Sequence, residues 1–265
     1  MSSSATDDQR ESSGVGGVAA VRRWFGSPLV GWGLWGANLA ALFGLVAWIA
    51  WDGKFVATAL VLKAELQTLV DGGAAAAGPA PQLGLRVTLL WALSAAAFAT
   101  TLGIFVSLFA GAHTHRRLRS WLAFTMLVAA WLAVFVAWRE LAWQGQRLRL
   151  RSSLSEFDAI AAALRDDWPA ADGRRAGLGT FMAYPQGRPR MLLMLTSNSR
   201  PAVAAVERAD DGSLGFELSG PESGTWLEWH PAGSTPQTFT GGLENEYEFR
   251  RAAPLGGGWY LVRYR

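Results

Sequence analysis

Leu29–Trp51 reads LVGWGLWGANLAALFGLVAWIAW, a run of 23 residues without Asp, Glu, Lys or Arg. A helix needs about 20 apolar residues to cross the roughly 30 Å hydrocarbon core of a bilayer. Two further uncharged runs follow, at Val87–Ala112 and Trp121–Trp138. Only helices and closed barrels satisfy their backbone in lipid, and runs of this length are too long for barrel strands. The sequence therefore predicts three transmembrane helices, with spans at about 29–51, 87–112 and 121–143.

The segments around the spans complete the expected domain organisation. Residues 1–28 are expected to form a disordered tail, because their first part is rich in Ser and Gly. The apolar run behind them is too long for a cleavable signal and is expected to remain as a membrane anchor. Residues 54–70 read as a short interfacial helix, and 72–81 as a Gly/Ala/Pro linker. The membrane region is thus expected at 29–143 and a soluble domain at 144–265.

The soluble region is predicted to be an α+β domain. Ser153 and Glu156 have capping-box spacing, which predicts a new helix from Leu154 that ends before Pro169. Short β-type segments punctuated by Gly, Pro and Asp follow, and they favour a small antiparallel sheet packed on that helix. The expected strands are 181–184, 191–195, 202–207, 214–218, 225–229, 246–250 and 259–264.

Composition excludes several classes of function. The chain has no Cys, so disulfides, thiol catalysis and Cys-based metal centres are ruled out. Residues 144–265 contain 14 Arg and 14 acidic residues, so no basic face indicates nucleic-acid binding. No ionisable residue lies in the middle of a span, where Asn38 is the strongest polar group, and this argues against conduction by this chain alone. No nucleotide, hydrolase or zincin motif occurs, and no cofactor or metal ligand set is expected.

Basic residues indicate an orientation. Arg116, Arg117 and Arg119 lie in the short turn between the second and third spans, where translocation is unfavourable. We therefore expect a cytoplasmic N-terminus and an extracytoplasmic C-terminal domain. The Ala, Gly and Arg content favours a bacterial inner membrane. His113 and His115 lie in the same turn and are expected to be solvated.

Small residues recur every four positions within the spans, a pattern that lets helix backbones approach closely. They either pack the three spans of one chain together or dock another membrane protein or a second copy of this chain. The candidate docking residues are Gly36, Ala40, Gly44, Gly103, Ser107 and Gly111.

Glu228 and His230 are the only candidate site residues in the soluble domain. They lie two apart on an expected strand and so point to one face, where they form either a surface pair or an acid/base or metal site. Trp226 and Trp229 are expected on opposite faces. No catalytic residue is predicted. A catalytic site would need Asp210, Glu228 or Glu246 to converge with His230.

Together these features favour a non-catalytic accessory, scaffold or assembly subunit of a membrane complex. The alternative is a membrane-anchored sensor or ligand-binding module with an extracytoplasmic domain, which requires a concave pocket in that domain.

Overall fold

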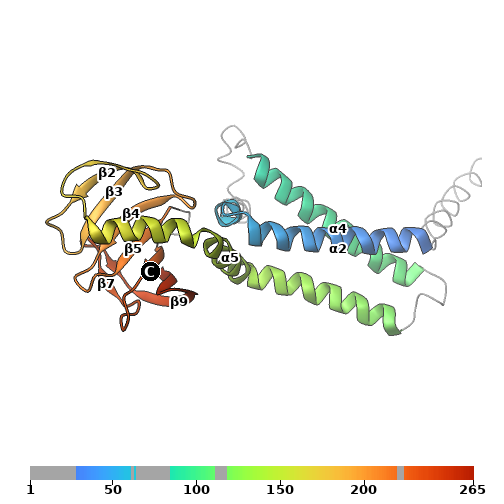
Figure 1. Ribbon diagram of the computed structural model, residues 1–265. Helices are drawn as coiled ribbons and strands as arrows, with labels where there is room; N and C mark the ends of the chain where they lie inside the picture. Colours follow the sequence, from blue (N-terminus) through green and yellow to red (C-terminus); the bar gives the residue numbers. More distant parts are fainter. Residues whose placement is uncertain (1–27, 61–62, 64–83, 111–117, 220–223) are drawn as a thin grey trace, which may run out of the picture. The chain divides into compact units, whose positions relative to one another are not determined.

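The computed structural model describes residues 28–60, 63, 84–110, 118–219 and 224–265 of the chain (Figure 1). The chain divides into two compact units. One contains Met1–Ile49 and Val61–Leu141, and the other contains Ala50–Leu60 and Ala142–Arg265. The predicted tail, the linker, most of the interfacial helix, and Gly111, His113 and His115 lie outside the described residues, although residues 55–60 are helical.

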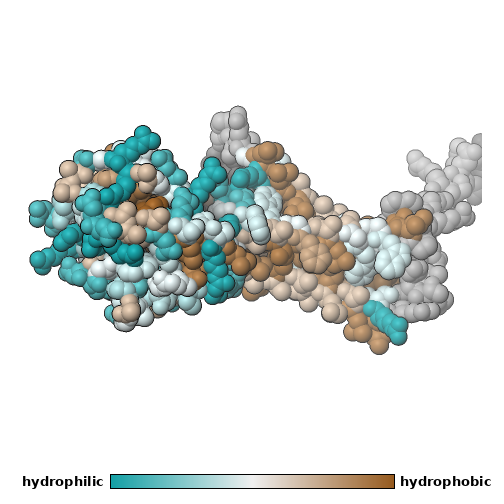
Figure 2. All heavy atoms as spheres, viewed as in Figure 1, coloured by the Kyte–Doolittle hydropathy of each residue, from teal (hydrophilic) through white to brown (hydrophobic). Residues whose placement is uncertain are grey.

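Three helices are long and apolar enough to cross a membrane: α2 (Pro28–Trp51), α4 (Leu85–Ala110) and α5 (Leu118–Asp166). Their outward positions carry large apolar side chains, among them Trp32 at 79% exposure and Phe135 at 81%. Figure 2 shows mostly hydrophobic residues over these helices and mostly hydrophilic residues over the sheet domain. An apolar exterior of this kind suggests membrane association.

A buried amide joins the three apolar helices. Asn38 of α2 is fully buried, and its amide nitrogen lies 2.8 Å from the hydroxyls of Thr100 and Thr101 and 3.1 Å from the carbonyl of Ala97, all on α4. The indole of Trp131 on α5 donates to Asn38 Oδ1 over 2.8 Å. Every hydrogen-bonding group of the Asn38 side chain therefore has a partner.

The third apolar helix continues into the sheet-containing unit. α5 is one helix of 49 residues, so the predicted new start at Leu154 is wrong. Ser153 does not cap a helix, because its hydroxyl lies 3.4 Å from the carbonyl of Arg149 one turn earlier. Leu150, Phe157 and Leu164 are buried along one side of the helix, and this packing continues the helix through the candidate cap.

The second unit contains a large antiparallel sheet rather than the small one expected. Eight strands pair in the order β1-β2-β3-β4-β5-β6-β10-β9, and β7 and β8 form a separate hairpin. All seven expected strands are present, although the segment 246–250 divides between two of them. The strands are β1 (Gly173–Arg175), β2 (Gly179–Tyr184), β3 (Arg190–Ser197), β4 (Val203–Arg208), β5 (Leu214–Leu218), β6 (Thr225–Trp229), β7 (Phe239–Thr240), β8 (Glu246–Tyr247), β9 (Phe249–Gly256) and β10 (Trp259–Tyr264).

The two faces of the sheet are covered differently. The last part of α5 lies across one face (Figure 1), where Phe157, Phe216 and Trp259 meet with ring centroids 5.6–6.3 Å apart. The other face carries a smaller buried cluster of Trp226, Val262 and Tyr264. Phe239 of β7 and Tyr247 of β8 pack on that cluster, so the hairpin covers only part of this face.

Candidate functional site

Strand register places two glutamates around a glycine on the face opposite α5. Glu207 of β4 pairs with Gly215 of β5, and Gly215 pairs in turn with Glu228 of β6. A glycine between them leaves space that any side chain would fill. A Cβ at Gly215 would lie 2.9 Å from the ring of Trp226, so this glycine also makes room for the indole.

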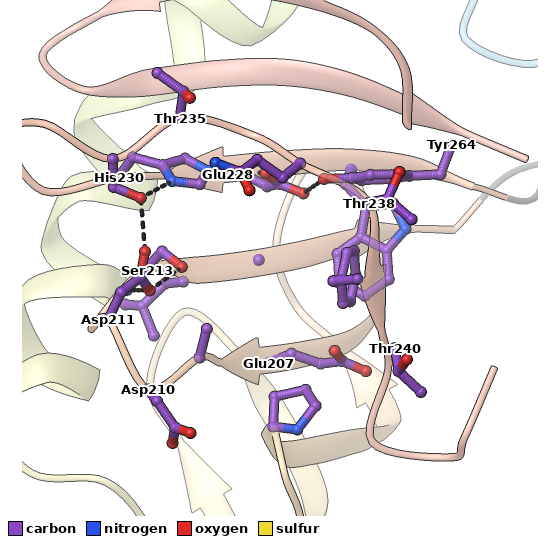
Figure 3. A pocket seen from close by; sticks show the side chains of 18 of the residues that line it. Glu207, Asp210, Asp211, Ser213, Glu228, His230, Thr235, Thr238, Thr240 and Tyr264 are labelled. Atoms are coloured by element: carbon purple, nitrogen blue, oxygen red, sulfur yellow. Dashed lines mark hydrogen bonds and ion pairs between the residues drawn. The ribbon is translucent and has the colours of Figure 1, made fainter. Parts of the chain in front are cut away.

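A cavity of about 420 Å³ opens at this position (Figure 3). Its volume lies within the roughly 300–1,000 Å³ range of small-molecule sites. Carboxylates, hydroxyls and aromatic rings line it together, and Arg188 is the only Arg or Lys in the lining. The carboxylates are Glu207, Asp210, Asp211 and Glu228, and the hydroxyls are Ser213, Ser234, Thr235, Thr238, Thr240 and Tyr264.

Glu228 and His230 form a buried pair in this cavity, with exposures of 5% and 7%, so the surface-pair interpretation is wrong. His230 Nε2 lies 2.9 Å from Glu228 Oε2, and the hydroxyl of Tyr264 donates to Glu228 Oε1 over 2.7 Å. The Glu228 carboxylate thus has a partner on each oxygen. Burial is the main reason that the pKa of Tyr264 is raised, and the carboxylate it contacts raises it further.

The hydrogen-bonded chain continues to the rim of the cavity. His230 Nδ1 lies 2.9 Å from Ser234 Oγ, and Ser234 donates to Asp211 Oδ2 over 2.6 Å. Because Ser234 gives its only proton to Asp211, its oxygen accepts from the Nδ1–H of His230. Burial opposes the charge of Asp211, but hydrogen bonds from Ser213 and Ser234 outweigh it and lower the pKa of that carboxyl. This chain is internally satisfied and fixes the imidazole in place.

Glu207 differs from Glu228, because half of its carboxylate has no partner. Its side chain is 5% exposed, and Oε1 accepts from the Gly242 N–H over 3.0 Å. Oε2 is buried and has no hydrogen-bond partner. Burial, with smaller contributions from the carboxylates of Glu217 and Glu228, raises the pKa of Glu207 to about 7.

A second unpartnered group lines the same cavity. Trp226 is fully buried, and its indole Nε1 has no acceptor. Among the described residues, four buried side-chain polar atoms lack a partner, and the other two, on Arg147 and Trp168, lie outside this cavity. A buried polar atom without a partner costs about 1–3 kcal/mol. Two residues of the lining therefore each carry a buried polar atom without a partner, an acceptor on Glu207 and a donor on Trp226.

The structure brings only some of the candidate catalytic residues together. Asp210, Glu228 and His230 line the cavity, whereas Glu246 of β8 does not. In the described part of the chain, no group of three or more His, Asp or Glu side chains could hold a metal ion. Trp226 and Trp229 point to opposite faces as expected, since Trp229 packs on the α5 side.

Sequence reasoning missed Glu207, Gly215 and Tyr264. The available signal was strand alternation, because Ala205 and Glu207 share a face of a segment that is otherwise apolar. Strand alternation alone does not predict which face of the sheet is covered by another segment. A glutamate near the end of a strand is therefore expected to be solvated.

The candidate docking residues occupy different environments. Gly36, Ala40 and Gly44 are exposed on α2, so they do not pack against the other described helices. Gly103 is buried, and a Cβ there would lie 3.2 Å from Leu34. Ser107 is half-buried and donates to the carbonyl of Ile104 in its own helix. These placements separate a packing contact on α4 from an open stripe on α2.

A second cavity, of about 650 Å³, lies within the sheet-containing unit. Arg149, Arg200 and Arg263 contribute to its lining, together with Trp51 and Trp143. None of the buried unpartnered polar atoms of the described residues lines it. The cavity beside Glu207 is therefore the better candidate for a site. Comparisons of the chain with family models, curated proteins and solved structures gave no match.

Proposed function

We propose that the protein is a membrane-anchored ligand-binding module. In this proposal the three apolar helices cross a bacterial inner membrane and hold the sheet domain at its outer surface. The cavity beside Glu207 is the ligand site. The proposal assigns no reaction to it.

One observation carries this proposal: two residues that each hold a buried, unpartnered polar atom line a single cavity of ligand size. Glu207 and Trp226, which carry the unpartnered Oε2 and Nε1, both line the 420 Å³ cavity. Leaving such atoms without partners is unfavourable, and a bound molecule can remove that cost by bonding to both. The neighbouring Glu228–His230–Ser234–Asp211 chain is already complete and holds the wall of the cavity in one geometry.

A thermal-shift screen of the full chain in detergent tests this proposal. Small polar molecules that bind should raise the melting temperature of the wild type. Thr240→Trp, which places a ring at the exposed rim of the cavity, should abolish the shift. Thr196→Trp, an exposed position of β3 outside the cavity lining, is the matched control and should retain it. Equal shifts in both variants, or no shift with any compound, would contradict the proposal.

The orientation is a separate part of the proposal. The N-terminus is placed in the cytoplasm and Arg265 outside it, because the turn with Arg116, Arg117 and Arg119 resists translocation. An alkaline phosphatase fused after Arg265 should be active in cells, since this enzyme needs the extracytoplasmic compartment. A fluorescent protein that folds only in the cytoplasm should stay dark at the same position. The reverse pattern would overturn this placement.

A second candidate function is an accessory subunit of a membrane complex. The exposed stripe of Gly36, Ala40 and Gly44 favours it, because a Cβ at Gly36 or Gly44 would meet nothing within 4 Å. Such a stripe allows close approach of a helix from another protein or a second copy of this chain.

Affinity purification from native membranes tests this second candidate. A stoichiometric membrane partner should accompany the wild type and be lost with Gly44→Leu, which fills the stripe. Phe43→Leu, at the neighbouring exposed position, should keep the partner. Recovery of the wild-type chain alone would contradict the subunit role and leave the binding-module proposal standing.

A further inference from the structure

We infer that the cavity beside Glu207 binds a small hydroxylated organic cation, whose ammonium group lies at Glu207 and one of whose hydroxyl oxygens accepts from Trp226. This inference rests on the proposed binding function and adds the chemical class of the ligand. It comes from the charge of the lining and from the types of the two open groups.

Charge selects a cation over an anion. Four carboxylates line the cavity, on Glu207, Asp210, Asp211 and Glu228. They outnumber the exposed guanidinium of Arg188 and the imidazole of His230, whose two ring nitrogens face Ser234 and Glu228. In this low-dielectric site an anionic ligand would face several like charges at once. A cation would instead be attracted.

Hydrogen bonding locates the cation within the cavity. The Glu228 carboxylate is occupied by His230 and Tyr264, and Asp211 is occupied by Ser213 and Ser234. Glu207 Oε2 is the buried acceptor that stays open. An ammonium group has three donors and no acceptor, so it supplies what this oxygen lacks. Figure 3 shows the Glu207 side chain extending toward Thr240, with Glu228 beyond it between His230 and Tyr264.

The second open group requires an acceptor on the same ligand. The indole N–H of Trp226 can only donate, so an alkyl amine would leave it without a partner. A hydroxyl oxygen of the ligand accepts this bond. The same hydroxyl can donate a hydrogen bond to hydroxyl side chains of the lining, such as Thr235, Thr238 and Thr240. A bare metal ion fits less well, because an N–H group repels it and the described residues contain no cluster of three ligands.

Isothermal titration calorimetry of the full chain in detergent at pH 8 tests the inference with three matched probes. Glucamine carries a primary ammonium and five hydroxyls. Sorbitol replaces the amine with a hydroxyl, and hexylamine keeps the amine and lacks the hydroxyls. Aliphatic amines of this kind titrate near 10, so both amines are cationic at pH 8. Glucamine should bind at least about tenfold more tightly than either relative, which corresponds to roughly 1.4 kcal/mol. Ethanolamine is a smaller hydroxylated ammonium, and it tests the same chemistry in case glucamine is too large for the cavity.

Variants connect the binding to the two open groups. Glu207→Gln should abolish the preference for glucamine over sorbitol, and Trp226→Phe should weaken glucamine while leaving hexylamine unchanged. Glu156→Gln is the matched control, because Glu156 is an exposed glutamate of α5 outside the cavity lining. A melting curve of each variant shows that it is folded.

The outcomes separate this inference from the proposed function. Equal binding of sorbitol and glucamine, or of glucamine by Glu207→Gln and wild type, would overturn the cation assignment and leave a ligand-binding module. If neither glucamine nor ethanolamine binds, while other compounds bind and Thr240→Trp blocks them, the cation assignment is likewise overturned and the binding module stands. If no compound binds, both the cation assignment and the proposed binding function are overturned.

Discussion

The three apolar helices and the sheet domain both bury polar side chains, but they treat them differently. In the helices, the Asn38 amide meets Ala97, Thr100 and Thr101, and its carbonyl accepts from Trp131. In the sheet domain, Glu207 Oε2 and Trp226 Nε1 are buried without partners. A complete buried network fixes a packing arrangement, whereas an incomplete one weakens the fold unless something else completes it. The first set of residues therefore serves the structure, and the second is the set that the proposed ligand would complete.

The largest effect should come from breaking the complete network. Asn38→Leu removes the bonds to α4 and leaves the N–H of the half-buried Trp131 without its acceptor. Interhelical hydrogen bonds in membrane bundles contribute about 0.6 kcal/mol each on average, and an orphaned donor adds to the loss. We expect a loss of roughly 2–3 kcal/mol in the helical unit, measured by denaturant unfolding in detergent. Adding Leu39→Asn to this variant supplies an amide at the neighbouring exposed position, and it should not restore the lost stability. An Asn38→Leu variant as stable as wild type would remove the structural half of the comparison.

Replacing a residue of the incomplete network should instead raise the stability of the fold. The folded state holds the pKa of Glu207 at about 7, above its ordinary value of 4.5, so the folded chain binds the proton more tightly than the unfolded chain. Stability from this group is fully present below pH 4.5, falls as the pH rises to about 7, and is constant above that. Glu207→Gln removes this loss. The variant should exceed wild type by about 1–2 kcal/mol at pH 8, because solvent screening and local relaxation reduce the full effect of the shift.

Denaturant unfolding at pH 5 and pH 8 measures this difference. Glu156→Gln serves as the control, because Glu156 is an exposed glutamate of α5 outside the cavity lining, and this variant should match wild type at both pH values. A Glu207→Gln variant that is less stable than wild type at pH 8 would show that the carboxylate is structural.

The smallest effect comes from a single atom. Replacing a tryptophan by benzothienylalanine exchanges the N–H for sulfur and preserves the shape of the ring. At Trp131 the exchange should cost about 1 kcal/mol, because it removes the acceptor's partner. At Trp226 it should cost close to nothing in the free protein, since no bond is lost there. Equal costs at the two positions, measured by unfolding, would show that Trp226 has a partner such as bound water.

The sequence predicted the parts of the fold that depend on local periodicity. The uncharged runs marked the three long helices, and alternation located strands such as β5 and β6. The three residues of β1 and the two of β7 are too short to show a period. The capping box at Ser153 was misleading, because contacts of Phe157 and Leu164 with distant strands decide whether the helix continues.

Less of the candidate site could be predicted. Glu228 and His230 were identified because they are neighbours on one strand, but their burial depends on what covers that face. Glu207 lies 21 positions earlier and reaches them only through Gly215, so its place follows from strand register. Asn38 was recognisable as the strongest polar group in the spans, whereas its partners lie 59–93 positions away.

The pKa of Glu207 in the free protein tests the central claim most directly. Carbon-13 NMR of the full chain with labelled glutamate carboxyls, assigned with Glu207→Gln, gives this value by titration. We expect a pKa of about 7 in the free protein and a lower value when glucamine supplies the missing donor. A pKa near the ordinary 4.5 in the free protein, unchanged by glucamine, would mean that the carboxylate already has its partners and that the cavity has no open acceptor.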